Sequence, residues 1–322
     1  MKRKITILAV ILCAAFGLLA ATGVVSSTKN PLQVALLHWY PANQVPTSFP
    51  AGGFTVGVAF DGGTIWAANA GSNSNSVMRF RTSDGLLLGT FLTGGSQPTN
   101  LAFDGANMWV VNSASNNVAK IRASDGALLG TFSVGTNPSG DVFDGANIWV
   151  ANAGSNNVTK LRARDGVTLG TFGVGTTPIF MAFDGTNIWV TNAGSGNVSK
   201  LNLSGTTLGT FAVGSSPEGV AFDGTNIWVT NFGSNNVTKL SKTGTILGTF
   251  AVGTSPLGIA FDGAHMWVAN HGNNSVTELS LSGANLGTFS VGNDPWGVAF
   301  DGANVWVANQ FFCCAAGTVS KL

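Results

Sequence analysis

The tripeptide Phe-Asp-Gly recurs along most of the chain at nearly constant spacing. Its aspartates are, in order, Asp61, Asp104, Asp144, Asp184, Asp223, Asp262 and Asp301. The first two are 43 residues apart (104 − 61), and each later spacing is 39 or 40 residues. A period of about 40 residues is typical of solenoids, propellers and other repeat arrays. The chain is therefore expected to contain seven copies of one supersecondary unit.

The contents of the unit select one of these architectures. In the copy at residues 217–253, apolar residues alternate with small or polar ones in four segments: 219–222, 227–230, 237–240 and 247–252. Gly, Asn, Asp, Ser or Pro bounds each segment, which is typical of short strands joined by tight turns. Four antiparallel strands per unit form the blade of a β-propeller. We therefore predict an all-β, seven-bladed β-propeller with four antiparallel strands in each blade.

The two ends of the repeat region complement each other. The seventh copy, which begins at residue 297, supplies only three strands, whereas residues 47–52 align with a fourth strand, residues 248–253 of an earlier copy. An N-terminal outer strand is therefore predicted to complete the last blade and to close the ring, because closure removes exposed sheet edges. Pro50 suits an outermost strand, where a missing N–H is tolerated. The predicted propeller spans residues 44–322.

Two sets of recurring residues have competing interpretations. A tryptophan occupies the second strand of every copy, and a ring of seven could form a ligand cage or fill the gaps between blades. Its constant position favours packing between blades. The recurring Asp is interpreted as a turn residue, because the sequence around it lacks the dense oxygen-ligand spacing of a calcium loop. His265 replaces an Asn in one of these turns and is interpreted as a solvated loop residue.

The N-terminal residues differ in character from the repeats. Lys2, Arg3 and Lys4 precede an apolar run at residues 5–21, which indicates a signal peptide or an uncleaved N-terminal anchor over residues 1–23. Residues 24–43 contain Pro, Ser, Thr and Asn and are expected to form a linker. These features predict a secreted, periplasmic or cell-surface protein that contacts a membrane only through an uncleaved N-terminal segment.

Composition limits the classes of partner. Only 9% of the residues are charged and the formal net charge is +1, so no basic patch favours nucleic acid. The expected partner is a protein, a glycan or a small molecule, and the expected state is a monomer.

The repeat resembles a known family. Ile188-Trp-Val-Thr-Asn192 and Ile227-Trp-Val-Thr-Asn231, each followed by Gly-Ser-x-Asn-Val, resemble the YVTN-type bacterial β-propeller repeat, with Trp in place of Tyr. The resemblance covers residues 47–322 and is specific for the fold. Similar propellers include NHL-type binding modules, surface-layer and secreted proteins, and virginiamycin B lyases, so the resemblance implies no single function.

Variation between copies is concentrated on one face of the predicted propeller. It falls at the residue after the loop Pro and at the residue after the Asn that ends the second strand. Larger side chains occupy these and neighbouring positions in the later copies, so one sector is predicted to bind a ligand through Phe180, Glu218, Phe232, His271, Trp296, Phe311 and Phe312. Drift among copies without a selected pocket is the competing interpretation.

Adjacent cysteines lie in the longest of these variable loops. Cys313 and Cys314 are compatible with a vicinal disulfide, with two free thiols or with an intermolecular bridge. No Cys-x-x-Cys or His-rich spacing accompanies them, so no zinc or other metal site is predicted.

Two classes of function remain after this comparison. The lack of clustered acids, bases and nucleophiles favours a non-catalytic binding or scaffold module that uses the variable loop face and no cofactor. The alternative is a metal-dependent enzyme similar to virginiamycin B lyase. That resemblance implies a His general base and a bound metal, for which the candidates are His271, Glu218 and Mg²⁺.

Overall fold

The structure is a computed structural model that describes residues 48–71, 75–310 and 317–322. The chain divides into two units, Met1–Val45 and Pro46–Leu322, and all described residues belong to the second. The predicted signal peptide or anchor and the linker lie outside the described residues. In the part that is described, no helix is long and apolar enough to cross a membrane.

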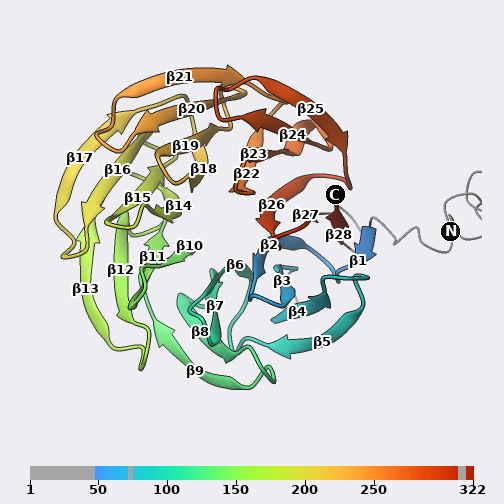
Figure 1. Ribbon diagram of the computed structural model, residues 1–322. Coiled ribbons are helices and arrows are strands. Elements are labelled where there is room, and N and C mark those ends of the chain that lie inside the picture. Colours follow the sequence, from blue (N-terminus) through green and yellow to red (C-terminus); the bar gives the residue numbers. More distant parts are fainter. Residues whose placement is uncertain (1–47, 72–74, 311–316) are drawn as a thin grey trace, which may run out of the picture. The chain divides into compact units, whose positions relative to one another are not determined.

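Seven four-stranded antiparallel sheets surround a common axis (Figure 1). The innermost strands are β2 (Thr55–Phe60), β6 (Pro98–Phe103), β10 (Pro138–Phe143), β14 (Pro178–Phe183), β18 (Pro217–Phe222), β22 (Pro256–Phe261) and β26 (Pro295–Phe300). The second strands are β3 (Thr64–Asn69), β7 (Asn107–Asn112), β11 (Asn147–Asn152), β15 (Asn187–Asn192), β19 (Asn226–Asn231), β23 (His265–Asn270) and β27 (Val305–Asn309). These elements confirm the predicted propeller.

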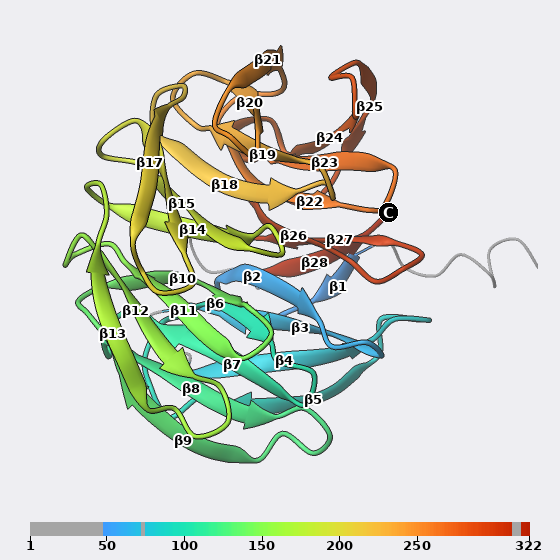
Figure 2. The ribbon, with the colours of Figure 1, turned by 60° about the vertical axis from the view of Figure 1, so that its left-hand side comes forward.

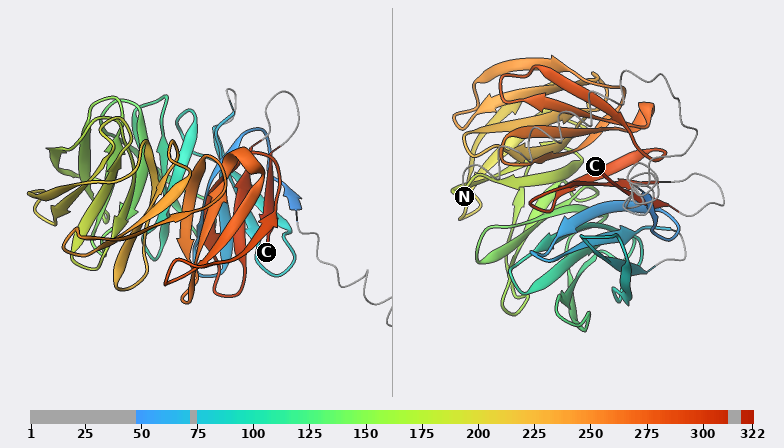
Figure 3. Two further views of the ribbon diagram at one scale, coloured as in Figure 1. Left: turned by 90° about the horizontal axis from the view of Figure 1, so that it is seen from above. Right: turned by 45° about the vertical axis from the view of Figure 1, so that its right-hand side comes forward.

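The two remaining strands of each blade complete the sheet toward the rim, as the oblique view shows for β10 to β13 (Figure 2). The third strands are β4 (Ser76–Arg81), β8 (Asn117–Arg122), β12 (Asn157–Arg162), β16 (Asn197–Asn202), β20 (Asn236–Ser241), β24 (Ser275–Ser280) and β28 (Thr318–Lys321). The outermost strands are β5 (Leu87–Leu92), β9 (Leu128–Ser133), β13 (Thr168–Gly173), β17 (Thr207–Ala212), β21 (Ile246–Ala251), β25 (Asn285–Ser290) and β1 (Ser48–Pro50). Loops lie at two opposite faces of the ring (Figure 3).

The ring closes through the predicted N-terminal strand. β1 pairs antiparallel with β28, with Phe49 opposite Val319, and the Ala51 N–H donates to the Gly317 carbonyl at 2.8 Å. The Phe49 side chain is buried, and its ring centroid lies 5.7 Å from that of Trp306. The outer-strand phenylalanines of six other blades contact their own tryptophans at 5.3–5.6 Å. β1 therefore supplies the same packing contact as a full outer strand.

Tryptophans fill the gaps between neighbouring blades, which confirms the packing interpretation. Six of the seven are completely buried: Trp66, Trp109, Trp149, Trp189, Trp228 and Trp306. A cationic side chain of the third strand covers the indole, as Lys200 does with its Nζ 5.2 Å from the Trp189 ring centroid. The same Nζ donates to the Lys242 carbonyl of the next blade at 2.7 Å. Each such cation therefore links two blades and also stacks on an aromatic ring.

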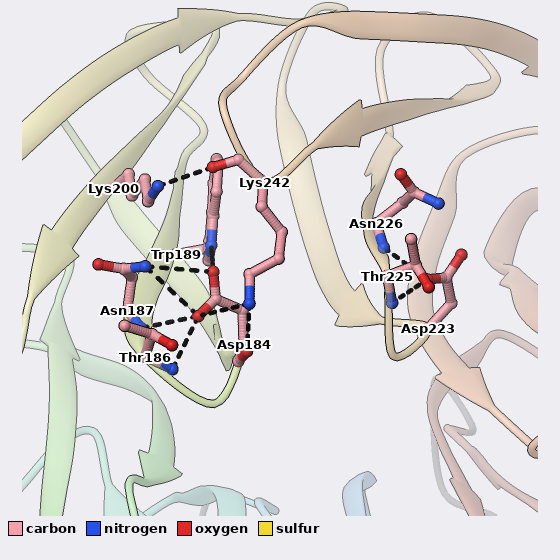
Figure 4. Close-up of polar contacts among 9 residues, drawn as sticks. All are labelled: Asp184, Thr186, Asn187, Trp189, Lys200, Asp223, Thr225, Asn226 and Lys242. Carbon is pink, nitrogen blue, oxygen red and sulfur yellow. Dashed lines mark hydrogen bonds and ion pairs between the residues drawn. The ribbon is translucent and has the colours of Figure 1, made fainter.

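The recurring aspartate organises the turn between the first two strands, as predicted. Asp184 Oδ1 accepts backbone hydrogen bonds from Thr186 at 2.9 Å and Asn187 at 2.7 Å (Figure 4). Its Oδ2 accepts the indole N–H of Trp189 at 2.9 Å. One carboxylate therefore fixes both the turn and the orientation of the tryptophan between blades.

His265 differs from the sequence interpretation, because it is not simply solvated. Its Nδ1 lies 3.0 Å from Glu278 Oε1 and 3.7 Å from Asp262 Oδ2. Glu278 occupies the third-strand position that holds Lys or Arg in the other blades, so no cation covers Trp267, which is only half-buried. His265 is the local polar partner of this substituted acid. The sequence interpretation considered the turn alone and not the facing strand.

The aspartate ring predicts a steep loss of stability in acid. Burial raises the pKa of each ring carboxyl, but the side-chain and backbone hydrogen bonds outweigh burial and hold every pKa below its ordinary value. A lowered folded-state pKa stabilises the fold above the unfolded pKa of about 4, and this contribution disappears as pH falls through the folded value. We expect the melting temperature to fall steeply below about pH 4. A melting temperature that is flat from pH 5 to pH 2.5 would contradict this role.

Candidate functional site

A cavity of about 650 Å³ lies at the propeller axis, on the face where the innermost strands begin and the second strands end. All seven blades contribute to it through the residue that follows the first residue of the innermost strand. These residues are Val56, Thr99, Ser139, Ile179, Glu218, Leu257 and Trp296. The same variable position of the repeat therefore lines the cavity in every blade.

Local turn geometry places these side chains at the axis. In six blades the innermost strand begins with Pro, preceded by a residue of positive φ, as with Ser216 (φ 49°) before Pro217. The strand register then shifts between Pro217 and Val220, so the two intervening residues lie outside the regular ladder. Such a bulge redirects a side chain, which explains why Glu218 can point into the cavity while Val220 packs between blades.

The residue after the second strand supplies the second part of the lining. The contributors at this position are Ala70, Ser113, Phe232, His271 and Gln310. The Asn that precedes this position is bonded across the second hairpin. Asn231 Nδ2, for example, donates to Asn236 Oδ1 at 2.7 Å and to Thr238 Oγ1 at 2.9 Å. Side chains of the third strand therefore hold this position, which a single-strand pattern does not reveal.

Glu218 is the acidic group of the cavity. Burial raises its pKa to about 7, and no described residue donates a hydrogen bond to its carboxylate. Its backbone carbonyl accepts a hydrogen bond from Thr191 Oγ1 at 2.6 Å. A carboxyl group with an elevated pKa in an apolar cavity is a common feature of functional sites.

His271 lies among the aromatic residues of the cavity. It begins the short helix η1 (His271–Asn273), and its ring centroid is 6.4 Å from that of Phe232 and 5.9 Å from that of Trp296. The His271 and Trp296 rings meet nearly edge to face, at 77°. No hydrogen-bond partner for the imidazole is found among the described residues. The ring nitrogens are thus held in place by packing and are free to bond a ligand.

Five of the seven predicted ligand-binding residues line this single cavity: Phe180, Glu218, Phe232, His271 and Trp296. The cavity is wider than the predicted sector, because every blade contributes to it. Phe311, Phe312, Cys313 and Cys314 lie outside the described residues. The role of all these residues in binding stays a prediction.

Ten of the fifteen lining residues are outside the predicted ligand-binding set, and Gln310 and Phe54 are the most informative of them. Gln310 is 1% exposed, and neither its Nε2 nor its Oε1 has a partner among the described residues. It occupies the variable position after Asn309, so its place in the repeat is the sequence feature that could have identified it. Phe54 also lines the cavity, from the loop between β1 and β2. In the repeat register it stands opposite Ser255, one residue before the loop Pro, and the equivalent Gln97 of the next copy lines the same cavity.

The cavity fits Mg²⁺ poorly. Its described lining offers one carboxylate, one imidazole, two carboxamides and three hydroxyl groups that already donate to backbone carbonyls, whereas Mg²⁺ prefers near-octahedral oxygen coordination. No group of three His, Cys, Asp or Glu residues suitable for a metal occurs in the described part of the chain. The described donors therefore give no basis for a metal-dependent step.

These features define the class of protein as a seven-bladed β-propeller with an aromatic cavity at its axis. No protein-family model matches the chain, and no curated protein matches it. Solved structures do: Kuenenia stuttgartiensis hydrazine synthase is 20% identical (TM-score 0.74, 85% of this chain and 96% of that chain). Staphylococcus aureus virginiamycin B lyase is 19% identical (TM-score 0.73, 85% and 97%). A catalytically inactive variant of that lyase with quinupristin is also 19% identical (TM-score 0.72, 85% and 98%). This level of identity establishes a shared fold alone.

Proposed function

We propose that the protein is a binding module that takes a small, largely apolar molecule into the axial cavity. One observation carries the proposal: variable positions from all seven blades meet at one cavity, where the Gln310 carboxamide has no partner among the described residues and none of them donates a hydrogen bond to the Glu218 carboxylate. Unpaired polar groups in a buried site are costly, so a ligand that bonds them gains affinity. The volume of about 650 Å³ lies in the usual range for small-molecule sites.

The setting of the module is part of the proposal. The basic and apolar N-terminal residues support export and a secreted, periplasmic or cell-surface location, with retention at a membrane only if that segment is uncleaved. The low charge argues against nucleic acid as the partner. We propose that the protein acts as a monomer, because residues of one chain line the cavity.

A fragment screen with a matched pair of variants tests this function. We expect ligand-observed NMR to find compounds that compete for one site and that lose at least tenfold in affinity with Phe232→Ala. The reason is that Phe232 forms part of the cavity wall. The control is Phe289→Ala, because Phe289 is 38% exposed and lies on an outermost strand. Absence of ligands, or ligands equally sensitive to both variants, would overturn the proposal.

Catalysis resembling that of virginiamycin B lyase is the second candidate. The specific observation in its favour is that His271 and Glu218 line the same cavity. His271 would act as the general base, since imidazole transfers protons near neutral pH. The test is incubation with Mg²⁺ and quinupristin, followed by mass spectrometry for ring opening. Ring opening that His271→Ala abolishes supports a lyase, and an intact ring removes this candidate.

A further inference from the structure

We propose that the axial cavity is selective for a protonated amine with an aromatic or alicyclic carbon body, held by Glu218 as its counter-ion. This inference rests on the proposed binding function and names the chemical class of its ligand. It follows from three properties of the lining: its charge, its aromatic side chains and its unpartnered polar atoms.

The charge of the cavity favours a cation. Glu218 is the only carboxylate among the described residues that line the cavity, and none of these is Lys or Arg. The lysines of the third strands are directed elsewhere: Lys200 and Lys239, for example, donate to backbone carbonyls of the next blade at 2.7 Å. No Lys or Arg of the described chain therefore compensates Glu218, and a ligand carboxylate or phosphate would meet an uncompensated like charge. A protonated amine supplies the missing opposite charge in a site where burial strengthens the attraction.

The aromatic side chains select the carbon body of the ligand. Phe54, Phe180, Phe232 and Trp296 line the cavity together with Glu218. Aromatic faces attract cations and also exclude water from an apolar ligand, which strengthens the ion pair. Small, strongly hydrated cations such as Na⁺ gain little from these walls. An amine attached to a ring or cage of carbon atoms satisfies both the carboxylate and the aromatic surface.

Gln310 gives an independent indication that the cavity accommodates a polar ligand. Its carboxamide is almost completely buried, and in the described part of the chain neither the nitrogen nor the oxygen has a hydrogen-bond partner. Glu218 belongs to the blade of β18 and Gln310 follows β27, two blades further along the ring. A ligand whose amine bonds Glu218 can therefore direct a second polar group toward Gln310. Such a ligand would satisfy both sites, whereas a pure hydrocarbon would leave both unpaired.

The ion pair has a defined pH dependence. Burial raises the pKa of Glu218 to about 7, and only the ionised carboxylate pairs with an ammonium group. Among the described residues that line the cavity, His271 is the one other titratable group, and the strands packed against β18 (β14, β15, β19 and β22) carry no charged residue. Affinity should therefore fall about tenfold between pH 8 and pH 6, because most of Glu218 becomes protonated.

Matched amine and alcohol pairs test the selectivity. The probes are tryptamine, phenethylamine and adamantylamine, each compared with its alcohol isostere, by NMR titration at pH 8 and pH 6. We expect at least one amine to bind tenfold or more tightly than its alcohol at pH 8. Glu218→Gln should remove both this preference and the pH dependence, while His271→Ala should retain the preference. Glu278→Gln is the matched control, because Glu278 pairs with His265 outside the cavity.

The outcomes separate this inference from the proposed function. Alcohols that bind as tightly as amines, with affinity still lost in Phe232→Ala, would overturn amine selectivity and leave the binding function in place. An amine preference that persists in Glu218→Gln would overturn the role of Glu218. Amines that fail to bind would overturn the inference, and a fragment screen that also finds no ligand would overturn the binding function with it.

Discussion

Removal of residues 44–51 is expected to lower the melting temperature by more than about 10 °C. The deletion removes β1, leaves β28 as an unpaired edge and exposes Trp306, which Phe49 covers. Loss of a buried Phe alone costs about 3–5 kcal/mol, and each kcal/mol lowers the melting temperature of a domain of this size by about 2–4 °C. Differential scanning calorimetry measures the effect directly.

Two point variants separate strand pairing from side-chain packing. Phe49→Ala retains the backbone ladder and should produce an intermediate loss, whereas Ser48→Ala should change little, because Ser48 is exposed. The contact of Phe49 with Gly85 gives a further reason to expect a loss of stability in Phe49→Ala. A Cβ placed on Gly85 would lie 2.1 Å from the Phe49 ring, so the first blade also packs on this side chain. A deletion variant that melts like the full chain would disprove closure by β1.

Asp141→Asn is expected to stabilise the protein by several kcal/mol at pH 8, with a much smaller gain at pH 5. Asp141 is buried in β10, at a position where the other innermost strands place apolar residues: Val58, Leu101, Met181, Val220, Ile259 and Val298. Its Oδ1 accepts a hydrogen bond from Asn100 Nδ2 at 3.0 Å, but its Oδ2 has no partner. Asparagine keeps the acceptor for Asn100 and cannot become charged.

The pH dependence of this variant follows from the sign of the pKa shift. Burial raises the pKa of Asp141 to about 8, although the hydrogen bond from Asn100 opposes the shift. A folded-state pKa above the unfolded value of about 4 means that the native state binds more protons between these two values, so stability falls as pH rises from 4 to 8. This pH range lies above the range in which protonation of the recurring aspartates lowers stability. Asp294→Asn, on a loop, is the matched control for the same chemical change, and equal gains at pH 5 and pH 8 would contradict the explanation.

Much of the fold was predictable because the same pattern of strands and turns recurs in seven copies. Any one copy is a weak signal for four strands, but the constant spacing from Asp104 to Asp301 excludes accidental patterns. Closure was also predictable, since residues 47–52 match an outer strand that the last copy lacks. Local hydrogen bonds explain this success: the Asp carboxylate, the turn and the Trp indole lie within five residues of one another.

The candidate site was predictable only in part. Glu218, Phe232 and His271 were identifiable as departures from the repeat, and they line one cavity. Phe54 was missed because it stands opposite Ser255 in the repeat, one residue before the loop Pro, and the prediction used only the residue after that Pro and the residue after the Asn. His265 was misinterpreted because its partner, Glu278, lies on the neighbouring strand of the same blade.

The sequence by itself determined the blade, the number of blades and the strand that closes the ring, because these depend on periodicity and on contacts between residues close in the chain. Only the tertiary structure decided which side chains share an environment at the axis. Glu218 and Gln310 are separated by two blades, yet both lack protein partners in one cavity, and Asp141 has one carboxylate oxygen without a described partner within an otherwise apolar ring. Burial and the absence of a partner are properties of packing between blades, and a residue's place in the repeat does not contain them.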